Sequence, residues 1–197
     1  NTPVAVLDLG SNSFRLVVYK ETTYPFKIVT QEREFIQLGE NMDENNKISS
    51  VKLNKARKVL KNLVATAKKN KVYHIYILAT AAIRESSNGK DIFKNISKDK
   101  NISINIISSL KEASYAAYGV ISSINKPRGI VADLGGGSLE IAGVDFKNII
   151  FRKSLNIGLL RKDSSLYKIN KLKFDQTIIN QFNKLNKIKF SMLFPFK

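Results

Sequence analysis

The sequence contains no cysteine, no tryptophan and a single histidine, His74, among its 197 residues. Without cysteine the chain has neither a disulfide framework nor a thiolate metal site, and one histidine makes no metal site, so we interpret His74 as structural. No apolar run approaches the length needed to cross a bilayer, and the N-terminus lacks the basic-then-apolar order of a signal peptide. We therefore expect a cytoplasmic protein with no membrane partner.

Acidic residues are also scarce, since 16 Asp and Glu stand against 33 Lys and Arg, giving a formal net charge of +17. One interpretation is a polyanion partner such as nucleic acid or polyphosphate, drawn in by long-range attraction. The other is compositional, because the chain is rich in Lys, Asn and Ile everywhere and its basic residues are scattered rather than gathered in one stripe. We favour the second interpretation and do not expect nucleic acid as a partner.

The hydrophobic pattern alternates between strand and helix spacing. Two β-prone runs, 4–10 and 14–20, are separated by only three residues and predict a tight hairpin. Further strands are expected at 26–30, 74–79 and 102–107, with three more from residue 129 onward, and helices at 51–69, from 81, at 111–123 and at 174–188. This alternation predicts an α/β fold, and the hairpins argue for a mixed rather than a parallel sheet.

The hairpin turn occurs twice in the sequence, as DLGSNS over residues 8–13 and as DLGGGS over residues 133–138. Each copy of this DLGxxS pattern ends one apolar strand and opens another. Two copies of one supersecondary unit, far apart in the chain, predict two like-folded halves. We accordingly divide the chain into a first phosphate-binding domain, 1–125, and a partial second domain, 126–197.

The chemistry of such a turn suits an anion. Glycine lets successive peptide N–H groups approach a phosphate, and Ser and Asn side chains add donors. An aspartate beside that nest would repel phosphate unless Mg²⁺ lies between them. A single DLG turn is most simply an ordinary hairpin turn, but two copies favour a phosphate cleft. The candidate phosphate-binding residues are Gly10, Ser11, Asn12, Ser13, Gly135, Gly136, Gly137 and Ser138.

Five segments in order along the chain resemble one family. They are DLGSNSFRLVVY (8–19), ATAAIRESSNG (79–89), ISSLKEASYAAYGV (107–120), DLGGGSLEI (133–141) and SLNIGLLR (154–161). Together they resemble the exopolyphosphatase and guanosine pentaphosphate phosphatase (Ppx/GppA) family, within the actin–Hsp70–sugar kinase superfamily. The resemblance implies an actin-like, ribonuclease H-like α/β fold with mixed sheets and flanking helices. It also implies Mg²⁺-dependent release of terminal phosphate from inorganic polyphosphate or guanosine pentaphosphate.

The resemblance further implies roles for individual side chains. The catalytic residues implied are Glu112 as the base, Arg84 on phosphate oxygens and Glu140 supporting the metal or the water. The additional phosphate ligands implied are Arg15 and Asn88. The Mg²⁺ ligands implied are Asp8, Asp133 and Glu140. Each has a simpler alternative: Arg84 could pair with Glu85 or Asp91, and an acid in the first turn of a helix, such as Glu112, is favoured by the helix dipole.

The sequence also departs from the family pattern. Lys111 occupies the place of one glutamate of a pair, and we expect its ammonium to lower the pKa of Glu112. Leu139 replaces a threonine beside the second loop. Nothing after residue 161 resembles the family's later glycine-rich motif, and the chain ends in the apolar run FSMLFPFK (190–197). We therefore expect a C-terminally truncated member whose second half is incomplete, a state that would favour association into a homodimer.

Three functions remain open at this stage. The first is a phosphoanhydride hydrolase acting on polyphosphate or guanosine pentaphosphate. The second is a truncated, catalytically impaired relative that binds phosphate or polyphosphate. The third, an ATP-dependent kinase of the wider superfamily, is the weakest, because no adenosine-binding segment is visible and the ATAAIRESSNG segment favours the phosphatases.

Overall fold

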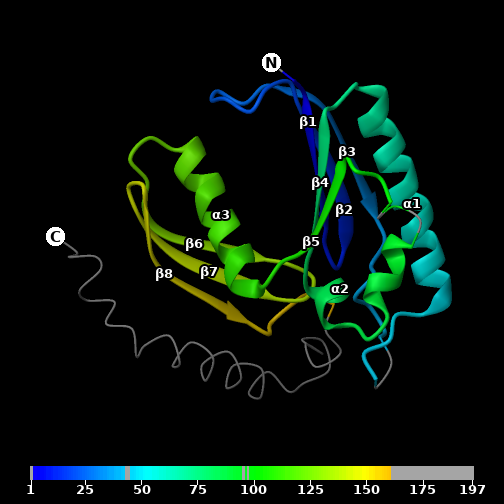
Figure 1. Cartoon of the computed structure of the whole chain (residues 1–197). Helices are drawn as coiled ribbons and strands as arrows, with labels where there is room; N and C mark the ends of the chain where they lie inside the picture. The colour runs from blue at the N-terminus through cyan, green and yellow to red at the C-terminus, as the bar shows by residue number, and fades with distance from the viewer. Residues whose placement is uncertain (1, 43–44, 95, 97, 161–197) are drawn as a thin grey trace, which may run out of the picture.

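A computed structural model describes residues 2–42, 45–94, 96 and 98–160 of the chain. Within them two β-sheets, each covered by a helix on one face, form two units that meet through their loops (Figure 1). The predicted α/β fold with mixed sheets and flanking helices is confirmed. None of the helices in these ranges is both long and apolar enough to cross a membrane. The helix expected at 174–188 and the apolar run at 190–197 lie outside the described residues.

The larger sheet has five strands in the order β3-β2-β1-β4-β5. Its strands are β1 (Val4–Leu9), β2 (Ser13–Tyr19), β3 (Ile28–Phe35), β4 (His74–Ala79) and β5 (Ile102–Ile106). The first three strands pair antiparallel, whereas β1 pairs parallel with β4, and β4 pairs parallel with β5. The hairpin prediction is therefore confirmed, and only β3 is displaced, since it begins and ends later than expected.

Helix α1 (Ser50–Lys69) covers one face of this sheet, as Figure 1 shows. Its N-terminus is capped by Ser49, whose side chain accepts a hydrogen bond from the peptide N–H of Lys52. The helix buries a stripe of apolar side chains against alternate residues of the strands, the spacing expected of an amphipathic helix on a sheet. This core includes Leu7, Leu9, Phe14, Leu16, Leu53, Leu60, Leu63, Ile75 and Ile77.

Because side chains alternate across a strand, the residues between these core positions point to the other face of the sheet. Asp8 of β1 is the cross-strand partner of Arg15 of β2, and Arg15 is the partner of Arg33 of β3. These three charged residues thus form one row on the face opposite α1. The row lies next to the turn between β1 and β2.

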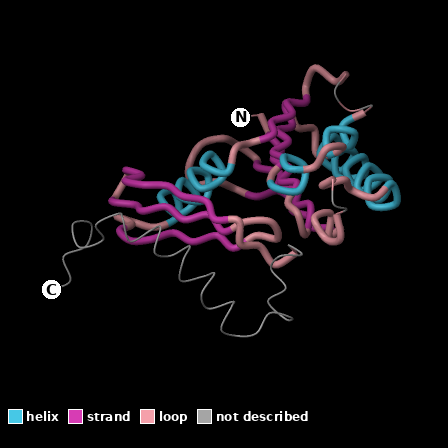
Figure 2. Tube along the Cα trace, turned by 90° about the horizontal axis from the view of Figure 1, so that it is seen from below, coloured by secondary structure: helices cyan, strands magenta, loops and turns pink. Residues whose placement is uncertain are grey.

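The smaller sheet has the order β6-β7-β8, with β6 (Arg128–Leu134), β7 (Leu139–Asp145) and β8 (Asn148–Leu155) all antiparallel. Helix α3 (Ser109–Ser123) packs on it, contacting all three strands. In Figure 2 the three strands extend away from the larger sheet, and the loops at their near ends lie toward it. The predicted division at residues 125 and 126 stays a prediction, although α3, which precedes it, packs on the smaller sheet.

Two short helices lie between β4 and β5 in the chain. Helix α2 (Ala81–Glu85) follows β4, at the position where a helix was expected to begin. The 3-10 helix η1 (Gly89–Phe93) was not expected; it places Ile92 and Phe93 in the main core. The start of α3 lies two residues earlier than predicted, because Ser108 caps it by accepting a hydrogen bond from the peptide N–H of Lys111.

Candidate active site

The two repeated turns have the same backbone geometry. In the first, the peptide N–H of Gly10 donates to the carbonyl of Ser13 at 3.1 Å, and in the second that of Gly135 donates to the carbonyl of Ser138 at 2.8 Å. Each turn joins two antiparallel strands, and each follows an aspartate by two residues. The internal repeat predicted from the DLGxxS pattern is therefore present as two equivalent hairpin loops.

The two loops touch each other. A Cβ placed on Gly136 would lie 3.0 Å from the Cβ of Ser11, and one on Gly137 would lie 2.6 Å from the Cβ of Ala81 in α2. Real Cβ atoms essentially never approach within 3.0 Å, so the second loop packs against α2, beside the first loop, only because residue 137 has no side chain. The glycines of the second DLGxxS turn are thus needed for the contact between the two units.

Neighbouring segments hold the first loop from outside. The peptide N–H groups of Ile36 and Gln37 donate to the carbonyl of Asn12, and that of Gly39 donates to the carbonyl of Ser11. The buried hydroxyl of Ser11 accepts a hydrogen bond from the N–H of Ala82 at 3.1 Å. The carbonyls of the loop are therefore occupied by other parts of the protein.

The peptide N–H groups of these loops are left available. Those of Ser11, Asn12 and Gly136 donate to no other residue in the described part of the chain. Clustered peptide donors without acceptors are the feature that makes a turn an anion nest. The backbone around Ser11 and Asn12 therefore has donors that could bind a phosphate oxygen, and its predicted role in phosphate binding stays a prediction.

One pocket of about 280 Å³ lies between the loops. Its walls come from both hairpins, from the start of α2 and from Glu112 in the first turn of α3. The lining residues are Asp8, Gly10, Ser11, Asn12, Ser13, Arg33, Thr80, Ala81, Glu112, Asp133, Leu134, Gly135, Gly136, Gly137, Ser138 and Leu159. All eight predicted loop residues, both predicted aspartates and the predicted base thus lie together.

Glu112 is held in place by Arg84 of α2. The Nη1 of Arg84 donates to the Oε2 of Glu112 at 3.0 Å and to the carbonyl of Ile107, also at 3.0 Å. Burial raises the pKa of Glu112 to about 7, the charges of Glu140 and Asp8 add to that rise, and Arg84 opposes it. A carboxylate with a pKa near neutral pH is suited to accept a proton from water.

The expectation that Lys111 lowers the pKa of Glu112 is wrong. Successive residues on a helix point in different directions, and the ammonium of Lys111 lies 5.7 Å from the ring centre of Tyr115, one turn further along α3. The pKa of Glu112 rises because burial and two nearby carboxylates outweigh the one guanidinium that bonds it. The net effect is a stronger base than the sequence suggested.

Arg84 also forms an ion pair with Glu85 at 3.4 Å, one of the two alternatives that the sequence left open. The other alternative is not found, since Asp91 pairs with Lys94. Arg84 does not line the pocket, so its predicted contact with phosphate stays a prediction, and its observed contact is with Glu112, the predicted base. Arg15 likewise lies outside the pocket lining, where its Nη2 donates to Gln31 at 3.4 Å.

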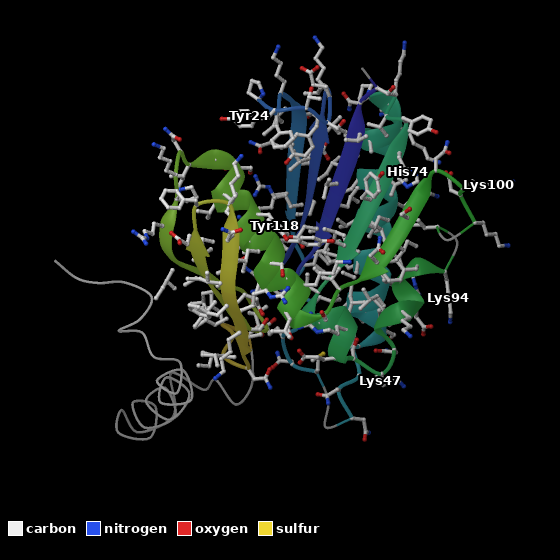
Figure 3. The ribbon with its side chains drawn as sticks, turned by 60° about the vertical axis from the view of Figure 1, so that its left-hand side comes forward. Tyr24, Lys47, His74, Lys94, Lys100 and Tyr118 are labelled. Atoms are coloured by element: carbon white, nitrogen blue, oxygen red, sulfur yellow. The ribbon has the colours of Figure 1, made fainter. Side chains whose placement is uncertain are left out.

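Asn88 is placed away from the loops. Its amide bonds the backbone of Ile48 in both directions, accepting from the N–H at 2.9 Å and donating to the carbonyl at 2.8 Å. It is absent from the pocket lining. Its predicted role in phosphate binding is untested, and this geometry favours a structural role. His74, labelled in Figure 3, is the first residue of β4, and its Nε2 lies 2.8 Å from the hydroxyl of Ser103.

The carboxylates of the pocket determine whether it can hold Mg²⁺. Within the described residues no three His, Cys, Asp or Glu side chains converge closely enough to hold a metal ion alone. Magnesium in phosphoryl-transfer sites is commonly held by one or two carboxylates together with substrate phosphates and water. Asp8 and Asp133 both line the pocket, and burial followed by the charge of Asp133 raises the pKa of Asp8 to about 6. Two mutually repelling carboxylates beside an anion nest fit a shared cation.

Glu140, the third predicted metal ligand, is set back from this pair. Its side chain is only 2% exposed, and the hydroxyl of Ser154 donates to its Oε1 at 2.8 Å. Burial raises its pKa, while hydrogen bonds from Ser138 and Ser154 oppose the rise. The geometry favours Glu140 as a charge behind Asp133, its cross-strand partner, rather than as part of the pocket wall.

Sequence reasoning missed Arg33. It lines the pocket, and its Nε donates to the hydroxyl of Ser13 at 2.9 Å. A longer third strand, paired with β2, would have placed Arg33 beside Arg15 and close to the turn. The strand was expected to end at residue 30, which left Arg33 outside it.

Comparisons with known proteins place this fold in a defined class. An exopolyphosphatase from Cytophaga hutchinsonii superposes with a TM-score of 0.79 at 22% identity, covering 95% of this chain and 64% of that one. A Ppx/GppA enzyme from Aquifex aeolicus gives a TM-score of 0.77 at 25% identity, with the same coverage. The chain thus shares the fold of these exopolyphosphatase and Ppx/GppA structures.

The sequence comparisons define the family. The sequence profile of the Ppx/GppA phosphatase family matches residues 17–181. The chain is 32% identical over 178 residues to a bifunctional 3-dehydroquinate synthase/phosphatase from Fusobacterium nucleatum, covering 85% of this chain and 27% of that protein. It is 30% identical over 197 residues to a guanosine-5'-triphosphate,3'-diphosphate pyrophosphatase from Pseudoalteromonas translucida, covering 94% and 39%. The chain belongs to the Ppx/GppA phosphatase family, and it spans well under half the length of these two relatives.

Proposed function

We propose that this chain carries the phosphate-binding half of a phosphoanhydride hydrolase that releases terminal phosphate from inorganic polyphosphate or guanosine pentaphosphate. The observation that carries the proposal is the meeting of two equivalent hairpin loops, with available peptide N–H groups, in one pocket that Glu112 also lines. Family membership supports hydrolysis of a phosphate compound. The names of the relatives support the two substrates.

In this proposal the peptide N–H groups of Ser11, Asn12 and Gly136 bind the oxygens of the terminal phosphate. Mg²⁺, held by Asp8 and Asp133 together with the substrate, would neutralise charge on the phosphate oxygens. Fixed donors that stabilise spread-out negative charge supply most of the catalysis in phosphoryl transfer. The loops therefore position the substrate, and Arg84 positions the base by its bond to Glu112.

Glu112 acts as the general base. It accepts a proton from a water molecule as the water oxygen attacks the terminal phosphorus, and the bond from phosphorus to the bridging oxygen breaks. The leaving phosphate keeps the electron pair of that bond. A pKa of about 7 means that a substantial share of Glu112 is ionised at neutral pH and can take this proton.

The experiment is phosphate release from long-chain polyphosphate and from guanosine pentaphosphate with Mg²⁺, comparing the chain with Glu112→Gln. We expect the substitution to reduce release by about 10²- to 10⁴-fold, the usual contribution of a general base. Glu85→Gln is the matched control, because Glu85 also bonds Arg84 but does not line the pocket. It should leave release nearly unchanged.

A second candidate is a relative that binds phosphate without turnover. The observation that favours it is the position of Arg84, which bonds Glu112 and does not line the pocket where a phosphate would bind. No release by a folded sample, combined with retained binding of tripolyphosphate, would select this candidate and reject hydrolysis by this chain.

A further inference from the structure

Arg33 is the one cation in the pocket lining as far as the described residues go. The lining also holds three carboxylates, Asp8, Glu112 and Asp133. A polyphosphate chain brings several negative charges into the pocket. The peptide N–H groups of the loops and a bound cation would compensate only the charge of the terminal phosphate. A second phosphate group needs a cation of its own, and Arg33 is the side chain placed to supply it.

The guanidinium of Arg33 is fixed before any ligand arrives. Its Nε donates to the hydroxyl of Ser13 at 2.9 Å, and its central carbon lies 5.0 Å from the ring centre of Phe35. The hydrogen bond to Ser13 fixes one edge of the guanidinium, and the ring of Phe35 covers one of its faces. Its two Nη nitrogens make no hydrogen bond within the described part of the chain. A guanidinium held in this way presents its remaining fork to a phosphate at little entropic cost.

The strand order places Arg33 and Glu112 on opposite sides of the first loop. That loop joins β1 to β2, in the middle of the order β3-β2-β1-β4-β5. Arg33 comes from β3, at one edge of the sheet, whereas Glu112 begins the helix that follows β5, at the other edge. In-line displacement puts the attacking water and the leaving group on opposite sides of the phosphorus. If Glu112 activates the water, Arg33 lies on the side of the leaving group.

We infer that Arg33 binds the second phosphate of the substrate, the group that leaves, and so selects phosphate chains over single phosphates. This inference rests on the proposed hydrolysis of a phosphoanhydride. As the bond from the terminal phosphorus to the bridging oxygen breaks, negative charge grows on the leaving phosphate. The Nη nitrogens of Arg33 stabilise that charge by a forked, charge-assisted pair of hydrogen bonds.

The test is calorimetric titration of the full chain with orthophosphate and with tripolyphosphate in the presence of Mg²⁺. Both titrations use the Glu112→Gln background, so that tripolyphosphate is not consumed. We expect Arg33→Gln to weaken tripolyphosphate binding about tenfold or more, the loss of one charge-assisted interaction, and orthophosphate binding less than about twofold. Arg33→Lys keeps the charge without the fork and should fall in between.

A control variant separates this effect from damage to the edge strand. Glu34→Gln changes the neighbouring residue, whose cross-strand partner Phe14 belongs to the opposite face of the sheet, and should leave both affinities unchanged. An equal loss for both ligands in Arg33→Gln would place Arg33 on the terminal phosphate and overturn the inference, as would no loss for either. If the parent chain binds neither ligand, the proposed function fails together with the inference.

Discussion

The Nη1 of Arg84 lies 3.0 Å from the Oε2 of Glu112, and each side chain is 20% exposed. The two residues are 28 positions apart and come from different helices, α2 and α3. A partly buried ion pair of this kind fixes the direction of the carboxylate and stabilises its charged form. Arg84 therefore positions the carboxylate of Glu112, the proposed base.

Loss of Arg84 should make Glu112 harder to ionise. Arg84 opposes the rise in the pKa of Glu112, so Arg84→Gln should move that pKa above its present value of about 7. Because the base must be ionised to accept a proton, the acidic limb of the pH–rate profile should move to higher pH, with activity partly regained in alkaline buffer. Arg84→Lys should move it less. An acidic limb that stays in place while the rate falls at every pH would contradict this role.

The pKa of Glu112 also predicts how folding stability depends on pH. The carboxyl has a pKa of about 7 in the folded chain against 4.5 as its ordinary value, so the folded state binds more protons between those limits. The free energy of unfolding should therefore fall as pH rises through this window. Glu112→Gln should remove on the order of 1–3 kcal/mol of that fall, with the remainder due to Asp8 and other groups.

Urea unfolding at pH 5 and pH 8 measures this difference. The comparison that matters is the gap between the two pH values, which should be smaller in Glu112→Gln than in the parent chain. Glu85→Gln again serves as the control and should keep the full gap. An unchanged gap in Glu112→Gln would show that the carboxyl is already ionised in the folded chain at pH 5, which is incompatible with a pKa of about 7.

The sequence predicted the backbone of the candidate site better than its side-chain contacts. Strand β4 falls on the predicted residues, and both DLGxxS turns form the expected hairpins, because glycine and alternating apolar residues encode them locally. The side-chain partners were harder to find. Lys111 was assigned to Glu112 because the two are adjacent in sequence, whereas the actual partner, Arg84, is brought there by the crossover from β4 through β5 to α3. Long-range pairing of this kind has no local signal.

Asn88 illustrates the same limit in a different way. Its amide bonds the backbone of Ile48 at both ends, tying η1 to the residue just before the cap of α1. Asn88→Ala should cost about 1–3 kcal/mol of unfolding free energy, since two hydrogen bonds are lost and the backbone groups of Ile48 lose their partners. Tripolyphosphate affinity should change less than about twofold in the same variant. A large loss of affinity with unchanged stability would instead support the phosphate contact predicted from sequence.

Magnesium and substrate should stabilise the chain together rather than separately. Asp8 and Asp133 supply only two carboxylates, too few for a closed metal site, so the remaining ligands must come from phosphate oxygens and water. A thermal shift series with Mg²⁺ alone, tripolyphosphate alone and both should therefore give a shift with both that exceeds the sum of the separate shifts.

The matched variant for this measurement is Asp133→Asn, which removes one carboxylate from the pocket and one charge from beside Asp8. It should abolish the excess shift while leaving the shift with tripolyphosphate alone. If Mg²⁺ alone produced the whole shift in the parent chain, the ion would be bound by a protein site that this pocket does not contain.

The contact between the two loops makes the sharpest structural prediction. A Cβ on Gly137 would lie 2.6 Å from the Cβ of Ala81, whereas one on Gly119, on α3, would meet no atom within 4 Å. Gly137→Ala should therefore destabilise the chain by about 1–3 kcal/mol and weaken phosphate binding, because the second loop must move away from α2 and from the neighbouring Ser11 of the first loop. Gly119→Ala should instead stabilise it by up to about 1 kcal/mol, since alanine favours a helix interior.

Urea unfolding of both variants, with orthophosphate titration of each, measures the two effects. Equal behaviour of the two variants would mean that the second loop is not packed against α2 in solution, and the pocket between the loops would lose its structural basis.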